Sequence, residues 1–453
     1  MRTIFIIVDT GAAIRNVLRT AIFDTLRQQP ELRLVIFTPI EEADFTRELA
    51  AHNVLFERVP KWKANPLVKM MRSFRRDLWA ETTALFSYRH RREKRRNRAL
   101  RTFLLPRITK WFFNGDPQRF LAFLHRWEMR FTPVLEKKYF DLYQPDLLFF
   151  TSLYSMDPCL ELSAWKQGIK TICLLHSWDN PTTKGPFPFE PDRLIVWNEI
   201  LRQEVRAYHG YPPERVQLSG VPQFDLYFER ESFLSREAFF AKHGLDPARK
   251  LVTYTTGSSG MVPFEPELVE RLHRDLMDPD FPFEVQLLVR MHPKDDLGLY
   301  QHLQGRPHLI LTRPGTHARI IDQWNPTREE MFGLAELMLY SDVVINVAST
   351  ITLDAAMFDT PVINVAFDAD RQEAFYNSCK RYYQYEHYRN IVATGGVPVV
   401  ESWEALRQSV GDLLRDPTLF AEGRRRIREE QALFVDGGSS ERVARFILDY
   451  LNE

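Results

Sequence analysis

The sequence has few of the features that would place it outside the cell, across a membrane or on nucleic acid. Its 453 residues include only three cysteines, too few and too scattered for a disulfide framework or a zinc cluster. No stretch approaches the roughly 18 apolar residues that a membrane-spanning helix requires, and the apolar run at residues 4–8 is too short for a signal peptide. The 60 basic and 60 acidic residues cancel, so net charge gives no indication of a nucleic-acid partner. We therefore expect a cytoplasmic protein, with peripheral contact to the inner face of the cell membrane left open.

The glycine fingerprint of dinucleotide-binding proteins is also missing. The turn at residues 9–13 follows the first expected strand and contains Gly11, but it has no G-x-G-x-x-G pattern. The composition is that of an ordinary globular protein, 44% hydrophobic and 26% charged, and the length suits two domains of about 200 residues each. Apolar runs without alternation recur between helical segments, as expected for parallel strands covered on both faces. These patterns predict an α/β protein with two Rossmann-like β/α/β domains.

We expect the first domain over residues 1–222, the second over 223–430 and a C-terminal helix over 431–453. Strands of the first domain are expected at residues 4–8, 32–37, 147–150, 171–175 and 194–197, with a helix at 14–28. Strands of the second domain are expected at residues 251–255, 285–289, 343–347 and 362–365.

One region departs from the charge balance. Residues 61–110 hold 16 Lys or Arg and three acidic residues, with aromatic residues interleaved. We expect a basic helical insertion over about residues 61–140. Its helices either lie on an anionic membrane surface, where each basic residue adds on the order of 1 kcal/mol, or pack as a solvated arm on their own domain. A nucleic-acid patch is disfavoured, because the total charge is neutral and no binding motif is present.

The most informative segment is residues 341–365, which reads as a buried strand, a small hydroxyl-bearing turn, a helix and a second buried strand. Ser349 and Thr350 fall where the helix begins, so their hydroxyls and the free backbone N–H groups favour a phosphate. Asp354 follows one turn later and is placed to accept from a ribose or sugar hydroxyl. The alternative is an ordinary helix cap in a β-α-β unit.

Other polar residues follow expected strands. Arg290 and His292 come at the end of strand 285–289, and His176 follows strand 171–175. Ligands of open α/β sheets bind outside the carboxyl ends of the strands, so we expect Arg290 and His292 to share a crevice with the turn at residues 349–350. After strand 251–255, the turn containing Gly257, Ser258 and Ser259 either forms a nest of N–H groups for a phosphate or merely reverses the chain.

These elements together resemble the GT-B superfamily, most closely the branch with the CDP-glycerol glycerophosphotransferases of teichoic-acid synthesis and related capsule glycosyltransferases. The resemblance covers roughly residues 145–450. The matching motifs are His176-Ser177-Trp178 with Lys184-Gly185 just after it, Arg290-Met291-His292-Pro293, the segment from Ser341 to Asp354, and the segment from Asp436 to Val443.

The resemblance implies a GT-B fold, with two Rossmann-like domains facing a central cleft and a terminal helix bracing the first domain. It places the acceptor on the first domain, with Gly11, Trp178 and Lys184 as expected contacts. The donor is then expected on the second domain, at Gly257, Ser258, Ser259, Arg290, His292, Ser349, Thr350 and Asp354.

Transfer from a nucleotide-activated donor needs a base for the acceptor hydroxyl and positive groups for the leaving phosphate. His176 is the candidate general base, since its ordinary pKa near 6.5 suits that work at neutral pH. Asp179 either orients the imidazole or caps its own loop through an Asx-turn. Of two Asp-x-Asp sequences, residues 278–280 read as a turn, and residues 368–370 remain a candidate metal site. Because Arg, His and backbone N–H groups supply a positive field, we predict no metal and no cofactor.

Three function classes remain. The first is a nucleotide-sugar glycosyltransferase acting on a surface-polysaccharide or lipid-linked glycan acceptor. The alternative is a CDP-glycerol-type glycerophosphotransferase, and a UDP-sugar 2-epimerase or a non-catalytic nucleotide-sugar binder is less expected. The residues do not fix the nucleotide of the donor.

Overall fold

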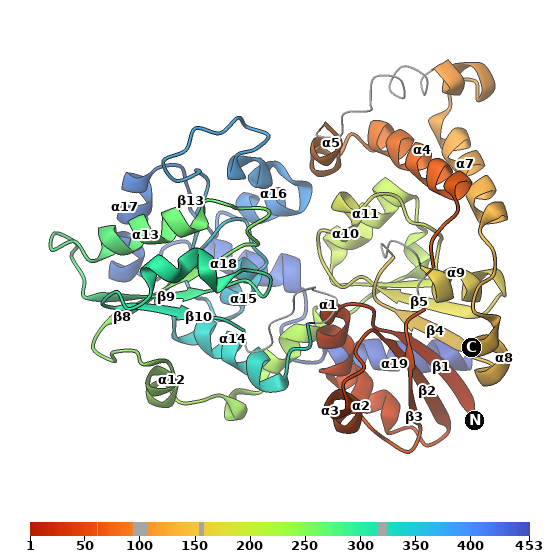
Figure 1. The fold of residues 1–453 in the computed structure, drawn as a ribbon, viewed down its shortest axis with the longest axis horizontal. Coiled ribbons are helices and arrows are strands. Elements are labelled where there is room, and N and C mark those ends of the chain that lie inside the picture. Colours follow the sequence, from red (N-terminus) through yellow and green to blue (C-terminus); the bar gives the residue numbers. More distant parts are fainter. Residues whose placement is uncertain (61, 94–106, 154–157, 315–323) are drawn as a thin grey trace. The chain divides into compact units, whose positions relative to one another are not determined.

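Two parallel β-sheets organise the described part of the chain, and each belongs to its own compact unit (Figure 1). The computed structural model describes residues 1–60, 62–93, 107–153, 158–314 and 324–453. The first unit comprises Met1–Asp9, Ala21–Ser219 and Glu441–Glu453, and the second comprises Thr10–Thr20 and Gly220–Ser440. The sequence analysis set boundaries at residues 222 and 430, and it did not anticipate that residues 10–20 would join the second unit.

The first unit contains a seven-stranded sheet in the order β3-β2-β1-β4-β5-β6-β7, with every neighbouring pair parallel. The strands are β1 (Arg2–Ile7), β2 (Leu32–Thr38), β3 (Val54–Arg58), β4 (Leu147–Phe150), β5 (Lys170–Leu174), β6 (Arg193–Val196) and β7 (Val216–Leu218). Its helices include α2 (Ala21–Arg27), α3 (Ala43–Glu48), α8 (Lys137–Tyr143), α9 (Cys159–Lys166), α10 (Asn180–Thr183), α11 (Glu199–His209) and α19 (Ser439–Asn452). The strand order reverses between β1 and β4, which makes the carboxyl ends of these strands a topological switch point.

A helical arm is inserted between β3 and β4. It contains α4 (Pro66–Thr83), α5 (Phe86–Glu93) and α7 (Pro117–Phe131), and α4 and α7 lie side by side (Figure 1). Both long helices begin at a capping side chain, since Asn65 accepts from Val68 N and Asp116 accepts from Gln118 N. The centre of the predicted basic insertion, residues 94–106, lies outside the described residues.

The second unit contains a six-stranded parallel sheet in the order β10-β9-β8-β11-β12-β13. Its strands are β8 (Lys250–Thr255), β9 (Val285–Arg290), β10 (Leu309–Thr312), β11 (Val343–Asn346), β12 (Val362–Val365) and β13 (Val399–Val400). Its helices include α12 (Arg236–His243), α13 (Glu265–Leu276), α14 (Arg328–Tyr340), α15 (Ile351–Met357), α16 (Glu386–Ala393), α17 (Trp403–Arg415) and α18 (Ala421–Ile427). Here the order reverses between β8 and β11, so the loops after these two strands meet at the switch point of the sheet.

The predicted helix at residues 14–28 is broken in the structure. A short α1 (Gly11–Ala13) leads into a π-helical turn, Ile14–Leu18, and α2 begins only at Ala21. Long-range contacts explain the break: Arg19 Nε donates to the Pro326 carbonyl at 3.1 Å, and Arg19 Nη2 donates to Asn325 Oδ1 at 3.0 Å. Residues 10–20 are therefore held by the second unit, to which they belong.

Candidate active site

His176 lies in the loop that follows β5, two residues beyond Leu174, and its side chain is half-buried. Its Nδ1 is 2.6 Å from the carbonyl oxygen of Thr151, which follows β4 directly. A carbonyl can only accept, so the proton of the neutral imidazole is on Nδ1 and the lone pair is on Nε2. The contact therefore joins the loops of two neighbouring strands and fixes the tautomer of the neutral ring.

The hydrogen bond of His176 Nδ1, which orients the ring, is made with Thr151 and not with Asp179. Asp179 Oδ1 accepts from Ser177 Oγ at 2.6 Å, and Asp179 Oδ2 accepts from Thr183 Oγ1 at 2.7 Å. Lys184 Nζ lies 3.6 Å from the same Oδ2. Asp179 thus organises its own turn, as in the Asx-type alternative, and a direct catalytic role for it stays a prediction.

The three expected acceptor contacts have different surroundings. Lys184 is 38% exposed at the end of α10. Trp178 is only 4% exposed, so it offers little surface to a ligand. Gly11 is buried at the start of α1 and belongs to the second unit, not to the first as expected.

The predicted phosphate nest after β8 is wrong at two of its three residues. Gly257 N donates to both carboxylate oxygens of Glu265 at 2.9 Å, and Ser259 N donates to Asp295 Oδ1 at 2.8 Å. Two acidic side chains thus take the N–H groups that a phosphate would have needed. Burial raises the pKa of Glu265 to about 8. Its carboxyl group therefore contributes to the packing of the loop rather than to a ligand site.

Arg290 and His292 occupy the end of β9, as the sequence analysis predicted from the strand pattern. Arg290 is the last residue of the strand and is half-buried. His292 Nδ1 accepts from Lys294 N at 3.1 Å, so the neutral ring carries its proton on Nε2 and remains a hydrogen-bond donor there. Burial lowers the pKa of His292, and Asp295 opposes that shift.

Three backbone N–H groups in the turn between β11 and α15 already donate hydrogen bonds to side chains of the protein. Ala348 N donates to Tyr383 Oη at 3.2 Å, Ser349 N to Asn346 Oδ1 at 3.2 Å, and Ile351 N to Ser349 Oγ at 3.3 Å. These N–H groups are therefore engaged within the protein. The hydroxyl proton of Ser349 and the exposed side chain of Thr350, which makes no capping bond, remain for a ligand.

Asp354 is 7% exposed and is not placed as a ligand-facing acceptor. Its Oδ1 accepts a hydrogen bond from the Tyr227 hydroxyl. Burial raises the pKa of Asp354, while the Tyr227 bond and the charges of Arg15 and Arg290 oppose the shift. Asp354 is thus a buried carboxyl group beside two arginines, and its expected contact with a sugar hydroxyl stays a prediction.

Arg15 is the functional candidate that the sequence analysis missed. It lies in the π-helical turn, is half-buried, and has its guanidinium carbon 5.8 Å from the centroid of the Trp324 ring. Burial lowers its pKa, and Asp354 and Tyr227 counteract this. Asp354 thus lies beside two half-buried arginines, and the charge of Glu330 also acts on Arg290. No residue pattern around Arg15 signals this, because its partners lie hundreds of positions away.

Comparison with known proteins shows the family to which the chain belongs. Residues 189–449 match the family described as CDP-Glycerol:Poly(glycerophosphate) glycerophosphotransferase, which is more than half of the chain. The chain belongs to this family. Arg290, His292 and the turn at residues 349–350 all lie within the matched stretch, whereas His176 and Arg15 lie before it.

One relative is only distantly similar to this chain. The teichoic acid poly(ribitol-phosphate) polymerase of Bacillus spizizenii is 24% identical over 209 residues, which are 42% of this chain and 30% of that protein. The chain therefore matches less than a third of the length of this relative.

Solved structures confirm the predicted GT-B fold. The wall teichoic acid polymerase TagF, soaked with CDPG, gives a TM-score of 0.51 at 12% identity, covering 100% of this chain and 89% of that chain. UDP-GlcNAc 2-epimerase from Neisseria meningitidis, bound to UDP-GlcNAc, gives 0.56 at 11% identity over 99% and 100% of the two chains. The S. aureus MnaA–UDP structure gives 0.54 at 14% identity over 100% and 97%.

The two Asp-x-Asp sequences of this glycerophosphotransferase-family chain have protein partners. Asp278 Oδ1 accepts from Asp280 N at 2.8 Å, which is an Asx-type turn as expected. Asp368 Oδ1 accepts from Cys379 N at 2.8 Å, and Asp370 Oδ1 accepts from Trp403 Nε1 at 2.8 Å. Among the described residues no three His, Cys, Asp or Glu side chains gather as metal ligands would, and metal independence stays a prediction.

Proposed function

We propose that the protein transfers an alditol phosphate from a CDP-activated donor to a hydroxyl group of a surface-polymer or lipid-linked glycan acceptor. The match of residues 189–449 to the glycerophosphotransferase family carries this proposal. It favours the phosphotransferase alternative over nucleotide-sugar glycosyl transfer, which the sequence analysis put first. Such a transfer breaks the bond between the β-phosphorus of the donor and the oxygen that bridges its two phosphorus atoms.

The residues divide the work as follows. His176 Nε2 takes the proton of the acceptor hydroxyl, whose oxygen forms a new bond to the β-phosphorus of the donor. The oxygen that bridges the two phosphorus atoms leaves with CMP and gains negative charge. Arg15 and Arg290 lie beside the buried Asp354 and supply the positive charge that this leaving group needs. Removing one such donor typically costs about 10²–10³ in rate.

Donor identity tests the proposal directly. The purified protein is incubated with CDP-glycerol, CDP-ribitol or a panel of UDP-sugars, together with a synthetic lipid-linked glycan acceptor. We expect acceptor-dependent release of CMP from a CDP-alditol, unchanged by EDTA. Release of UDP from a UDP-sugar, with no reaction of either CDP-alditol, would establish glycosyl transfer instead.

The His176→Ala variant separates chemistry from donor binding. We expect it to lose acceptor-dependent transfer while it binds the CDP-alditol with nearly unchanged affinity, since His176 lies outside the arginine cluster. Transfer at more than a tenth of the wild-type rate would assign His176 a structural role.

A further inference from the structure

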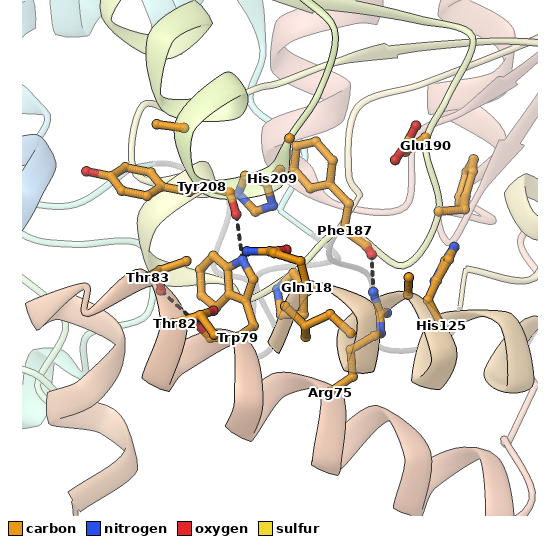
Figure 2. A pocket seen from close by; sticks show the side chains of 16 residues that line it. Arg75, Trp79, Thr82, Thr83, Gln118, His125, Phe187, Glu190, Tyr208 and His209 are labelled. Atoms are coloured by element: carbon orange, nitrogen blue, oxygen red, sulfur yellow. Dashed lines mark hydrogen bonds between the residues drawn. The ribbon is translucent and has the colours of Figure 1, made fainter. Parts of the chain in front are cut away.

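The first unit contains a cavity of about 490 Å³ that the proposed chemistry does not use (Figure 2). Its walls come from α4 and α7 of the helical arm, from residues 186–190, and from the C-terminal end of α11. The volume falls within the range of about 300–1,000 Å³ typical of small-molecule sites. The lining residues on which the argument rests are Trp79, Gln118, His125, Phe187, Glu190 and His209.

Two histidines of the lining carry unsatisfied ring nitrogens. His209 Nε2 contacts the Pro181 carbonyl at 2.8 Å and so carries the proton, which leaves Nδ1 as an acceptor. His209 Nδ1 and His125 Nδ1 are both buried without a hydrogen-bond partner among the described residues. Buried polar atoms of native proteins are almost always paired. Two orphans in one cavity indicate that a ligand completes them.

The electrostatics of the cavity favour a neutral ligand. The charge of Arg75 is opposed by Glu128, whose Oε2 lies 2.9 Å from Arg75 Nε and whose Oε1 pairs with Arg72. Arg75 Nη1 donates to the Phe187 carbonyl at 2.6 Å (Figure 2). Burial lowers the pKa of His125 and of His209 to about 4, so both rings are uncharged at neutral pH. Among the described lining residues, the charge of Arg75 is thus opposed by that of Glu128, and Glu190 would repel a phosphate.

The apolar surface of the cavity is aromatic. The His209 ring is stacked between Phe187, with centroids 3.9 Å apart, and Trp79, with centroids 5.3 Å apart. Trp79 is fixed by a 2.7 Å bond from its Nε1 to the Tyr208 carbonyl (Figure 2). Aromatic faces beside hydrogen-bond acceptors match a ring with an apolar C–H face and hydroxyl groups on its edge.

We propose that this cavity binds a neutral polyhydroxylated ring, a sugar unit of the acceptor glycan. The assignment of that sugar to the acceptor rests on the proposed function, whereas its chemistry rests on the cavity alone. The cavity wall continues the loop of the candidate base, since α10 follows the His176 turn and residues 186–190 follow α10. His209 holds Pro181 of α10, and Ser87 Oγ donates to the Thr182 carbonyl at 2.8 Å, so the loop and the helical arm are fixed together.

Binding is measured on the full chain without any donor, by ligand-observed NMR and calorimetry. The probes are glucose and N-acetylglucosamine, with glucose 6-phosphate as the charged counterpart and glycerol as an acyclic one. We expect the neutral rings to bind at least tenfold more tightly than glucose 6-phosphate or glycerol. Absence of neutral-ring binding, or preference for the phosphorylated ring, would overturn the proposal.

Two variants locate the binding. His125→Phe keeps a ring of similar size but removes the orphan nitrogen, so the fold should keep its stability while affinity for the neutral ring falls at least tenfold. Gln118→Trp obstructs the cavity and should also abolish binding. Arg119→Trp changes the adjacent exposed residue of α7, which does not line the cavity, and should bind like the wild type.

Unchanged affinity in both His125→Phe and Gln118→Trp would place the sugar elsewhere and refute the site. Failure of the two proposals is distinguishable, because the binding assay contains no donor. Sugar binding without CMP release from any donor supports the cavity and refutes the proposed function. CMP release without sugar binding refutes the cavity alone.

Discussion

At the scale of single residues, the arginine cluster of the second unit shows how a carboxylate and two cations share one place. Asp354 is buried, bonded to Tyr227, and close enough to Arg15 and Arg290 for their charges to oppose the rise of its pKa. Arg290 has a second acidic neighbour, Glu330, whose charge also opposes the fall of the Arg290 pKa. We assign the leaving phosphate to these arginines because their half-buried guanidinium groups carry the positive charge that it needs.

The Asp354→Asn variant tests this assignment. It keeps the size of the side chain and removes the compensating charge, so the second unit should melt at a lower temperature. CDP should then stabilise the variant more than it stabilises the wild-type protein, because the ligand phosphates replace the lost carboxylate. Asp412→Asn on the surface helix α17 is the matched control. Equal CDP-induced shifts in melting temperature for wild type and Asp354→Asn would contradict the assignment.

Glu265 predicts a dependence of stability on pH. Burial raises its pKa from 4.5 to about 8, so between these pH values the folded protein holds a proton that the unfolded chain releases. Stability therefore falls as pH rises from about 4.5 to 8, with the unfolding constant growing about tenfold per pH unit for this one group. Glu161, whose pKa burial also raises to about 8, contributes in the same direction.

The Glu265→Gln variant removes a titrating proton without removing the side chain. We expect denaturant unfolding of the second unit, followed from pH 5 to pH 8, to show a shallower loss of stability than in the wild type. Identical slopes would mean that Glu265 has an ordinary pKa in the folded protein.

At the scale of elements, one buried carboxylate joins the two long helices of the arm. Glu128 of α7 is 0% exposed, and its oxygens lie 2.7 Å from Arg72 Nε and 2.9 Å from Arg75 Nε of α4. Removing one partner of a buried ion pair costs about 3–5 kcal/mol, because it leaves a charge buried without compensation. The pairing of α4 with α7 therefore depends on this residue.

We expect Glu128→Gln to loosen the arm while the second unit stays intact. Hydrogen exchange should accelerate in α4 and α7, and limited proteolysis should cut there first. Glu422→Gln removes an exposed partner of Arg425 on α18 and should change nothing measurable. Unaltered exchange in α7 of the Glu128→Gln variant would show that apolar packing alone holds the arm.

At the scale of the whole molecule, the balanced total charge conceals a local asymmetry. No helix of the described chain is long and apolar enough to cross a bilayer. The outer face of α7 nevertheless exposes Phe123, Trp127 and Phe131, which contact one another in sequence, beside the exposed Arg126 and Arg130. Aromatic and basic residues on one helix face match an interfacial lipid surface.

We expect the protein to co-sediment with vesicles that contain anionic lipid and not with zwitterionic vesicles. The binding should weaken above physiological salt, where the Debye length is already only about 8 Å. Phe123→Ser with Trp127→Ser should abolish it, whereas Phe375→Ser with Tyr376→Ser, an exposed aromatic pair of the second unit, should not. Equal binding to neutral vesicles, or none to either, would leave α7 as a solvated arm.

Most of the fold could be predicted from the sequence, because it depends on local patterns. Apolar runs without alternation marked the parallel strands, and the residues at strand ends, His176, Arg290 and His292, were found because parallel strands bring their carboxyl ends to one edge of a sheet. The GT-B fold and the family followed from motifs of this kind. The turn at residues 278–280 was also local enough to predict.

Only the tertiary structure decided which of these residues are free to act. The N–H groups of Gly257 and Ser259 go to Glu265 and Asp295. Arg15 joins Asp354 from across more than three hundred positions, because residues 10–20 belong to the second unit. The spacing of residues along the chain predicts which side chains share a strand or a helix face. It does not predict which distant acidic side chain accepts a hydrogen bond from a given backbone N–H group, because that depends on packing between segments whose separation in sequence follows no pattern.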